Sequence, residues 1–234
     1  MPSDEPTKLS EIVVPLLAGD RHQVVPLGNH AKAELILGAV DQDDCAAYRV
    51  SGDAVLVAGS DYIRGVGFYL YEQGYLTDYD IGWYLAGANF SDVAAMGALP
   101  IALLSVVRYP RDMPDLNFQE IIRGISESCR AVAAFNVGGD IGSAETVILS
   151  ASALGLVEPD LLLQRSGARP GDLLCLSGAT GLAGAAMKLA RAGILEDIDE
   201  AARVTLLERW RRVRARVPHG RALATSGAAT ACID

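Results

Sequence analysis

The chain has 234 residues, half of them hydrophobic, and carries a formal net charge of −9. This length suits one large domain or one domain with part of another, and the hydrophobic content excludes a chain that is disordered throughout. The negative charge argues against binding along a nucleic-acid backbone, and because no apolar run approaches the ~18 residues of a membrane helix we expect a cytoplasmic protein that does not bind membranes.

The N-terminal part of the chain contains few structural signals before a hairpin. Residues 1–35 are predicted to be an irregular lead-in. Two strand-like runs follow, Ala46–Val50 and Ala54–Ala58. The short Ser51-Gly52-Asp53 turn between them predicts that the two strands pair as a hairpin.

Apolar residues recur at helical spacing over Ile81–Met96 and predict a helix. Asp80 is the expected N-cap of this helix, and Gly97 is its expected C-terminal stop. Asn89 and Asp92 are three positions apart, so their side chains share one face of the helix. We expect that face to meet a ligand.

Two more strands and a second helix complete this region. The apolar run Ile101–Val107 predicts a buried strand, and the pattern over Asp115–Ala134 predicts a helix. Gly138-Gly139-Asp140 is interpreted as a tight loop and Thr146–Val157 as another strand. The order of elements predicts an α+β domain over residues 36–158, with a mixed four-stranded sheet and helices on one face.

The remainder of the chain is expected to be a connector and part of a second domain. Residues 159–172 are rich in proline and glycine, which is typical of a connector. We then expect a strand over Leu173–Leu176 and helices over Leu182–Ala192 and Asp197–Val217. Because about 60 residues cannot easily enclose a second core, residues 173–234 are expected to form an incomplete C-terminal α/β domain.

Two other groups of residues carry no clear chemistry. The four cysteines form no Cys-x-x-Cys pair, and the three histidines give no zinc signature, so we interpret the cysteines as reduced thiols. A basic cluster near the C-terminus is interpreted as a solvated helix face rather than an RNA contact. It consists of Arg209, Arg211, Arg212, Arg214 and Arg216.

Aspartates carry the strongest chemical signal, because the usual phosphate-binding loop and the nucleophile elbow are both missing. Carboxylates that converge beside buried structure are best compensated by hard divalent cations, above all Mg²⁺. Mg²⁺ held by a few carboxylates is also how proteins grip a nucleoside triphosphate, so the sequence predicts an ATP-dependent enzyme. The aspartate-bearing segments are Asp43-Asp44-Cys45-Ala46, Ser60-Asp61, Asn89-Phe90-Ser91-Asp92 and Gly138-Gly139-Asp140.

A longer pattern resembles a known family. The run Ala88–Pro100 is similar to the signature of thiamine-monophosphate kinase, whose superfamily includes aminoimidazole ribonucleotide synthase, selenophosphate synthetase and a hydrogenase maturation factor. The resemblance covers residues 36–193 or so. Other segments resemble the family's motifs in the right order, namely Asp43–Ala46, Ser60–Phe68, Gly138–Asp140 and Gln164–Asp172.

The resemblance implies a specific site and assembly. N-terminal domains would pair so that two four-stranded sheets form a barrel-like homodimer core, with ATP and Mg²⁺ in a cleft near that interface. By matching position, the metal ligands would be Asp44, Asp61, Asp92 and Asp140, with Asp43 as a weaker candidate. The residues at the nucleotide would be Asn89, Gly138, Gly139 and Ser60, and no catalytic residue is assigned.

Three functions stay open at this point. The first is an ATP- and Mg²⁺-dependent phosphotransferase, similar to thiamine-monophosphate kinase, that transfers the γ-phosphate of ATP to a small, phosphorylated acceptor. The second is a synthase of the same superfamily that activates an amide or carboxylate oxygen for cyclisation or dehydration; departures from the family such as Ile141-Gly142-Ser143 keep it open. The third is a non-catalytic dimerisation module, because the sequence ends at Cys232-Ile233-Asp234, which resembles only the start of the family's Ile-Asp-x-Ser-Asp-Gly motif.

Overall fold

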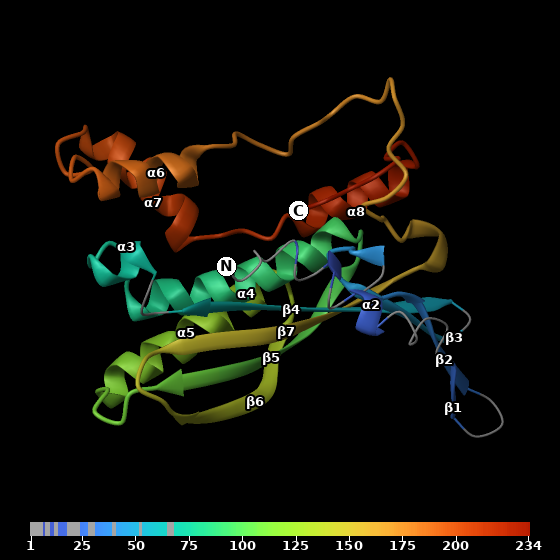
Figure 1. Cartoon of the computed structure of the whole chain (residues 1–234), viewed down its shortest axis with the longest axis horizontal. Helices are drawn as coiled ribbons and strands as arrows, with labels where there is room; N and C mark the ends of the chain where they lie inside the picture. Colours follow the sequence, from blue (N-terminus) through green and yellow to red (C-terminus); the bar gives the residue numbers. More distant parts are fainter. Residues whose placement is uncertain are drawn as a thin grey trace.

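The computed structural model describes residues 7, 10–11, 14–17, 24–27, 31–38, 41–51, 53–64 and 68–234. Within these residues one sheet is covered by helices, and a second group of helices lies over the first (Figure 1). The strands are β1 (Val24–Leu27), β2 (Ala31–Leu37), β3 (Ala46–Ser51), β4 (Ala54–Arg64), β5 (Leu99–Tyr109), β6 (Phe135–Ser143) and β7 (Ile148–Val157). The helices are α2 (Val14–Leu17), α3 (Tyr69–Glu72), α4 (Asp78–Ala95), α5 (Asp115–Ala131), η4 (Pro159–Leu161, a 3₁₀ turn), α6 (Leu182–Arg191), α7 (Glu200–Arg211) and α8 (Val217–Ser226).

The strands lie in the order β1-β2-β3-β4-β7-β5-β6. Neighbours are antiparallel except β5 and β6, which are parallel and joined by α5. A parallel pair needs such a crossover, and α5 supplies it on the helix-covered face. The expected mixed sheet with helices on one face is therefore present. The expected number of four strands is wrong, because β1, β2 and β6 also belong to the sheet.

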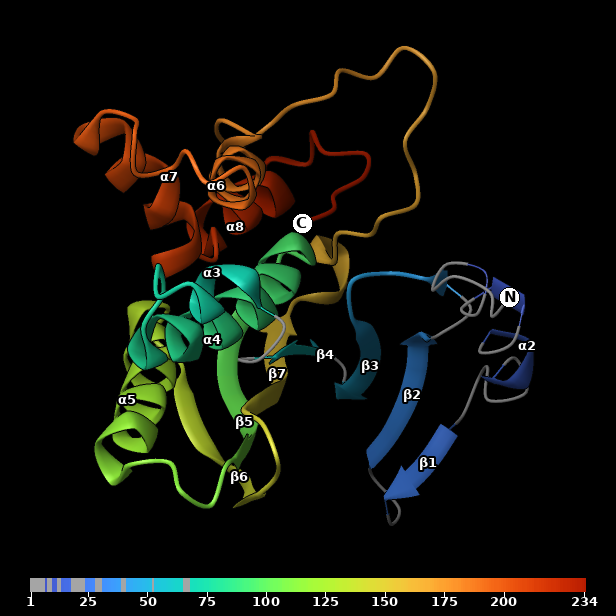
Figure 2. The same cartoon turned by 60° about the vertical axis from the view of Figure 1, so that its left-hand side comes forward.

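The core of the protein lies between this sheet and α4 and α5. Leu85 and Phe90 of α4, Ile125 of α5, Leu103 of β5 and Leu149 of β7 are all fully buried there. The opposite side of α4 is covered by α7 and α8 (Figure 2). A helix enclosed on both sides is apolar around most of its circumference, and this explains the small residues that fill α4.

The predicted hairpin and first helix are confirmed with one correction. β3 and β4 pair as expected, although Gly52 of the turn lies outside the described residues, as do Gly65–Gly67 of the family resemblance. The N-cap of α4 is Thr77 and not Asp80. The Thr77 hydroxyl accepts from the Asp80 N–H, and the Asp80 carboxylate accepts from the Thr77 N–H. This capping box satisfies two backbone donors at once, so the helix begins one turn earlier than predicted.

The interpretation of Gly138-Gly139-Asp140 as a tight loop is wrong, because these residues lie inside β6. Gly138 and Gly139 have φ angles of +138° and +142°, which side chains other than hydrogen rarely allow. A Cβ on Gly139 would overlap the carbonyl oxygen of Ser105 on β5. The glycine pair therefore allows β6 to lie close against β5 rather than to turn.

Two further expectations at the ends of the chain are wrong. The lead-in is not irregular throughout, since β1 and the first part of β2 lie within it and extend the sheet. Leu173–Leu176 does not form a strand, and Leu173 and Leu174 are 89% and 93% exposed. An apolar run becomes a strand only beside a partner strand, and none of the described residues pairs with it.

The last helices match the prediction more closely. α6 is the helix expected over Leu182–Ala192, whereas the helix expected over Asp197–Val217 is divided into α7 and the start of α8. The irregular segment between them crosses α4, where the Trp83 indole N–H donates to the Val213 carbonyl at 2.8 Å. In the part of the chain that the structure describes, no helix is both long and apolar enough to cross a bilayer.

Candidate metal and nucleotide site

Three aspartates from distant parts of the sequence meet beside the C-terminal half of α4. Asp44 precedes β3, Asp92 lies on α4, and Asp234 lies in the segment that follows α8. One carboxylate oxygen of each lies within 4.8 Å of the others. Carboxylates this close repel one another, and oxygen ligands gathered in this way are those that Mg²⁺ prefers.

The C-terminal segment reaches this point by running beside the connector. The Cys232 N–H donates to the Gln164 carbonyl at 2.9 Å, and the Thr230 hydroxyl donates to the Asp172 carboxylate at 2.6 Å. These two contacts hold the segment that carries Asp234 against the connector. The position of Asp234 is thus set by long-range contacts.

The connector is held in turn by the loop before β3. One carboxylate oxygen of Asp43 accepts from the Arg165 N–H at 3.0 Å, and the other accepts from the Asp44 N–H at 2.9 Å. The Asp43 carboxylate therefore shapes the loop, and the neighbouring Asp44 side chain turns toward Asp92 and Asp234.

The two carboxylate oxygens of Asp44 have different surroundings. One forms an ion pair with the Arg165 guanidinium, although the side chain of Asp44 is only 4% exposed. The other, Oδ2, is buried and has no hydrogen-bond partner among the described residues. An unpartnered buried carboxylate oxygen is costly, and a cation would satisfy it. The donor set and this oxygen together fit a divalent cation.

Electrostatics at Asp92 agree with that fit. The pKa of Asp92 is raised to about 7. Burial is the largest cause, the carboxylates of Asp234, Asp44 and Asp61 also raise it, and Arg165 lowers it. A bound cation would favour the ionised form of the Asp92 carboxyl. Burial also raises the pKa of the neighbouring Cys45 thiol well above its usual range, so Cys45 is a neutral, buried side chain here.

Asp61 joins this group through α4. Its backbone N–H donates to the side-chain oxygen of Asn89 at 3.0 Å, and the Asn89 amide donates to the Leu85 carbonyl at 2.9 Å. Side chains alternate along a strand, so Asp61 lies on the same face of β4 as the buried Ile63 and Val57. This is the face that α4 covers.

Asp140 and Ser60 lie on the other face of the sheet. Asp140 is opposite Val106 and forms an ion pair at 2.6 Å with Arg108. The Ser60 hydroxyl lies 2.6 Å from that of Ser152, its register partner on β7. Three inter-strand spacings, about 14 Å, also separate β4 from β6. Within one chain, the structure thus brings Asp44 and Asp92 together and places Asp61 near enough to raise the pKa of Asp92, but Asp140 lies elsewhere.

Two residues at this site were absent from the predicted ligand set. Asp234 completes the group of three carboxylates, and the guanidinium of Arg165 forms the ion pair with Asp44. A signal for Asp234 was present in the sequence, since Ile233-Asp234 resembles the start of a family motif. Arg165 lies within the connector run that also resembles the family.

Comparisons with known proteins agree with this geometry. Residues 42–157 match the family model of the AIR synthase related protein, N-terminal domain. The chain is 33% identical over 177 residues to thiamine-monophosphate kinase of Halobacterium salinarum, covering 73% of this chain and 56% of that protein. It is 33% identical over 149 residues to selenide, water dikinase of Caldanaerobacter subterraneus, covering 63% and 40%.

The fold agrees over almost the whole chain. A solved structure of AaThiL complexed with AMPPCP and TMP superposes with a TM-score of 0.75 and 22% identity, covering 96% of this chain and 65% of that one. The chain spans between 40% and 56% of the length of the two curated relatives. With the aspartate motifs in place within the matched domain, this chain belongs to the AIR synthase related superfamily, together with the thiamine-monophosphate kinases and the selenide, water dikinases.

Proposed function

We propose that this chain is the ATP- and Mg²⁺-binding part of a phosphotransferase that passes the γ-phosphate of ATP to a small, phosphorylated acceptor. The observation that carries the proposal is the meeting of Asp44, Asp92 and Asp234 around the unpartnered Oδ2 of Asp44. The names of the relatives, a kinase and a dikinase, support phosphoryl transfer as the shared chemistry. Bound Mg²⁺ would supply neutralisation of the triphosphate charge.

The residues of the chain have distinct tasks in this proposal. Asp44, Asp92 and Asp234 would hold the cation, and Asp61 would stand beside them on β4. Asn89 would position Asp61 from the buried side, because both polar atoms of its amide are engaged inside the protein. Arg165 balances the negative charge of Asp44 and would be free to approach a phosphate once a cation takes its place.

A synthase of the same superfamily is the second candidate, and the family model that matches residues 42–157 favours it. Such an enzyme would use the same metal and nucleotide contacts but would activate an amide or carboxylate oxygen. Product analysis distinguishes the two functions. A phosphorylated acceptor with ADP identifies the kinase, whereas ADP, free phosphate and a dehydrated product identify the synthase.

We also propose that two copies pair through the uncovered face of the sheet. Figure 2 shows α4 and α5 on one side of β4, β7, β5 and β6, with no described helix on the other side. Exposed apolar side chains lie there, a composition typical of an interface. They are Tyr62, Leu104, Phe135, Ile148 and Leu156.

Calorimetric titration with ATP tests the function directly. We expect ATP to bind in the presence of Mg²⁺ and not in EDTA, and we expect Asp92→Asn to weaken binding at least about tenfold because a metal ligand is lost. Asp160→Asn is the matched control, since Asp160 is an exposed aspartate of η4 that does not belong to the group of three carboxylates. Absence of any Mg²⁺-dependent ATP binding by the wild-type protein would refute the proposal.

A further inference from the structure

A cavity lies between α7, α8 and the segment of residues 212–216 that joins these two helices. It has a volume of about 710 Å³. We call it the arginine groove after the four arginines of its lining, Arg209, Arg212, Arg214 and Arg216, which lie there with Glu208 and His219. None of these residues belongs to the aspartate site. In a chain with a net charge of −9, such a concentration of guanidinium groups needs an explanation.

Among the described residues, a carboxylate neutralises only one of the four arginines. Arg212 forms an ion pair with the buried Asp80 at 2.5 Å. Arg209 and Arg214 are exposed and have no ion pair or hydrogen bond of their side chains within the described parts of the chain. Glu208 is the single acidic residue of the lining. The groove therefore holds an excess of positive charge.

Arg216 connects the groove to the glycine turn before α6. Its guanidinium donates to the Ser177 carbonyl and packs where a side chain at Gly178 would lie. A guanidinium has five N–H donors, so this bond leaves others for a ligand. Ser177 thus fixes the orientation of Arg216 at the wall of the groove.

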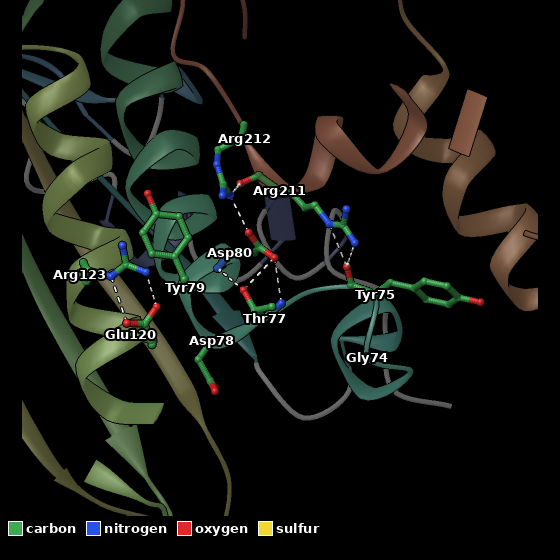
Figure 3. Close-up of a pocket in the computed structure, with 10 residues that line it drawn as sticks. All are labelled: Gly74, Tyr75, Thr77, Asp78, Tyr79, Asp80, Glu120, Arg123, Arg211 and Arg212. Carbon is green, nitrogen blue, oxygen red and sulfur yellow. Dashed lines mark hydrogen bonds and ion pairs between the residues drawn. The ribbon is translucent and has the colours of Figure 1, made fainter. Parts of the chain in front are cut away.

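The neighbouring cavity in Figure 3 provides a contrast. It has a volume of about 650 Å³ and shares Arg212 with the groove. There, Arg123 pairs with Glu120, and Arg212 pairs with Asp80. Arg211 donates twice to the Tyr75 carbonyl. Charged groups in that cavity have partners within the protein, whereas the side chains of Arg209 and Arg214 find none among the residues that the structure describes.

We propose that the arginine groove binds a small phosphate-bearing molecule at a site separate from the aspartates. Guanidinium groups bind phosphate oxygens through paired, charge-assisted hydrogen bonds. A concave volume of this size is typical of small-molecule sites. The net negative charge of the chain argues against a nucleic acid, which would need a basic surface wider than this groove.

Titration with inorganic pyrophosphate in EDTA tests the proposal without involving the aspartate site. Without a cation, the carboxylates of Asp44, Asp92 and Asp234 repel an anion, so metal-free binding would report the groove. We expect the wild-type protein to bind and the Arg209→Gln/Arg214→Gln variant to bind at least about tenfold more weakly. We also expect added salt to weaken the interaction.

A matched control separates a local site from general charge. The Arg111→Gln/Arg130→Gln variant removes two exposed positive charges that lie outside the groove, and we expect its pyrophosphate affinity to stay within about twofold of wild type. Asp44→Asn should also retain pyrophosphate binding, so a failure of the proposed ATP function would not be mistaken for a failure of this site. Absence of pyrophosphate binding at millimolar concentration would overturn the proposal. Equal affinity of the groove variant and wild type, or tighter binding of an RNA oligonucleotide through Arg209 and Arg214, would overturn it as well.

Discussion

The side-chain oxygen of Asn89 accepts a hydrogen bond from the backbone N–H of Asp61 at 3.0 Å. Beyond Ala58, no described strand pairs with β4 on the β3 side, so this N–H would otherwise lack a strand partner among the described residues. Asn89 is 1% exposed and lies one helical turn before Asp92. A single buried amide therefore fixes the distance between the strand that carries Asp61 and the helix that carries Asp92.

Replacement of Asn89 by alanine should lower the free energy of unfolding by about 1–3 kcal/mol, because the buried bond to the Leu85 carbonyl and the part-buried bond from the Asp61 N–H would both be lost. Urea denaturation measures this loss. Asn117→Ala is the control, since the exposed Asn117 amide bonds to Asp78 on the surface and should change stability by less than about 0.5 kcal/mol. Equal stability of the two variants would contradict a structural role for Asn89.

The raised pKa of Asp92 predicts a pH-dependent stability in the absence of metal. Its folded-state pKa of about 7 exceeds the ordinary value near 4. The folded protein therefore binds more protons than the unfolded chain between these values, so the contribution of Asp92 to stability is full below pH ~4 and lost as the pH rises through about 7. Asp92→Asn should remove this dependence. In EDTA at pH 8 the variant should be more stable than wild type by about 2 kcal/mol, and the difference should vanish near pH 4.

Thermal unfolding at pH 5 and pH 8 measures the effect. Addition of Mg²⁺ at pH 8 should raise the Tm of the wild-type protein by several degrees and that of Asp92→Asn by less, since a ligand that binds only the folded state stabilises it. If Asp92→Asn in EDTA at pH 8 has a lower Tm than the wild-type protein, the carboxylates of Asp44, Asp92 and Asp234 do not repel one another in the folded state.

Local sequence patterns were sufficient to predict the helices and strands whose apolar residues recur at a regular spacing. α5 has one apolar stripe at helical spacing, and β7 alternates buried and more exposed residues, so both could be predicted from their own residues. β6 could not, because Gly138-Gly139 indicates a turn unless the closeness of β5 is known. The prediction for Leu173–Leu176 was wrong in the opposite way, since its apolar residues predict a strand but no described strand pairs with them.

The candidate site shows the same limit. Asp44, Asp61, Asp92 and Asp140 were named together because their motifs resemble one family. The structure brings Asp44 and Asp92 together, places Asp61 near enough to raise the pKa of Asp92, and leaves Asp140 on the other face of the sheet. Asp234 was left out of the ligand set, although contacts of Cys232 and Thr230 with the connector bring it to Asp44. Such long-range contacts have no local sequence pattern. The roles of the aspartates as metal ligands stay predictions.

The glycine pair of β6 offers a matched test of backbone geometry. Both residues have positive φ, but only Gly139 faces an atom where a Cβ would lie, whereas the space around Gly138 is open. Gly139→Ala should therefore cost about 3 kcal/mol or more of unfolding free energy, and Gly138→Ala about 1–2 kcal/mol from backbone strain alone. Urea denaturation of the two variants measures the difference. Similar losses would mean that the overlap with Ser105 is relieved by a small shift of β6.

The uncovered sheet face provides the test of self-association. Leu104 is 42% exposed at the centre of that face, between Ser152 and Gly138 in the strand register. If two copies pair there, Leu104→Lys would bury an unpaired charge in the interface, which should raise the dimer dissociation constant by at least about a hundredfold. Leu116→Lys is the control, because Leu116 is 74% exposed on α5, on the other side of the sheet. Light scattering on a sizing column should give a dimer for wild type and Leu116→Lys and a monomer for Leu104→Lys. A monomeric wild-type protein, or a Leu104→Lys dimer as tight as wild type, would exclude this face as the contact between copies.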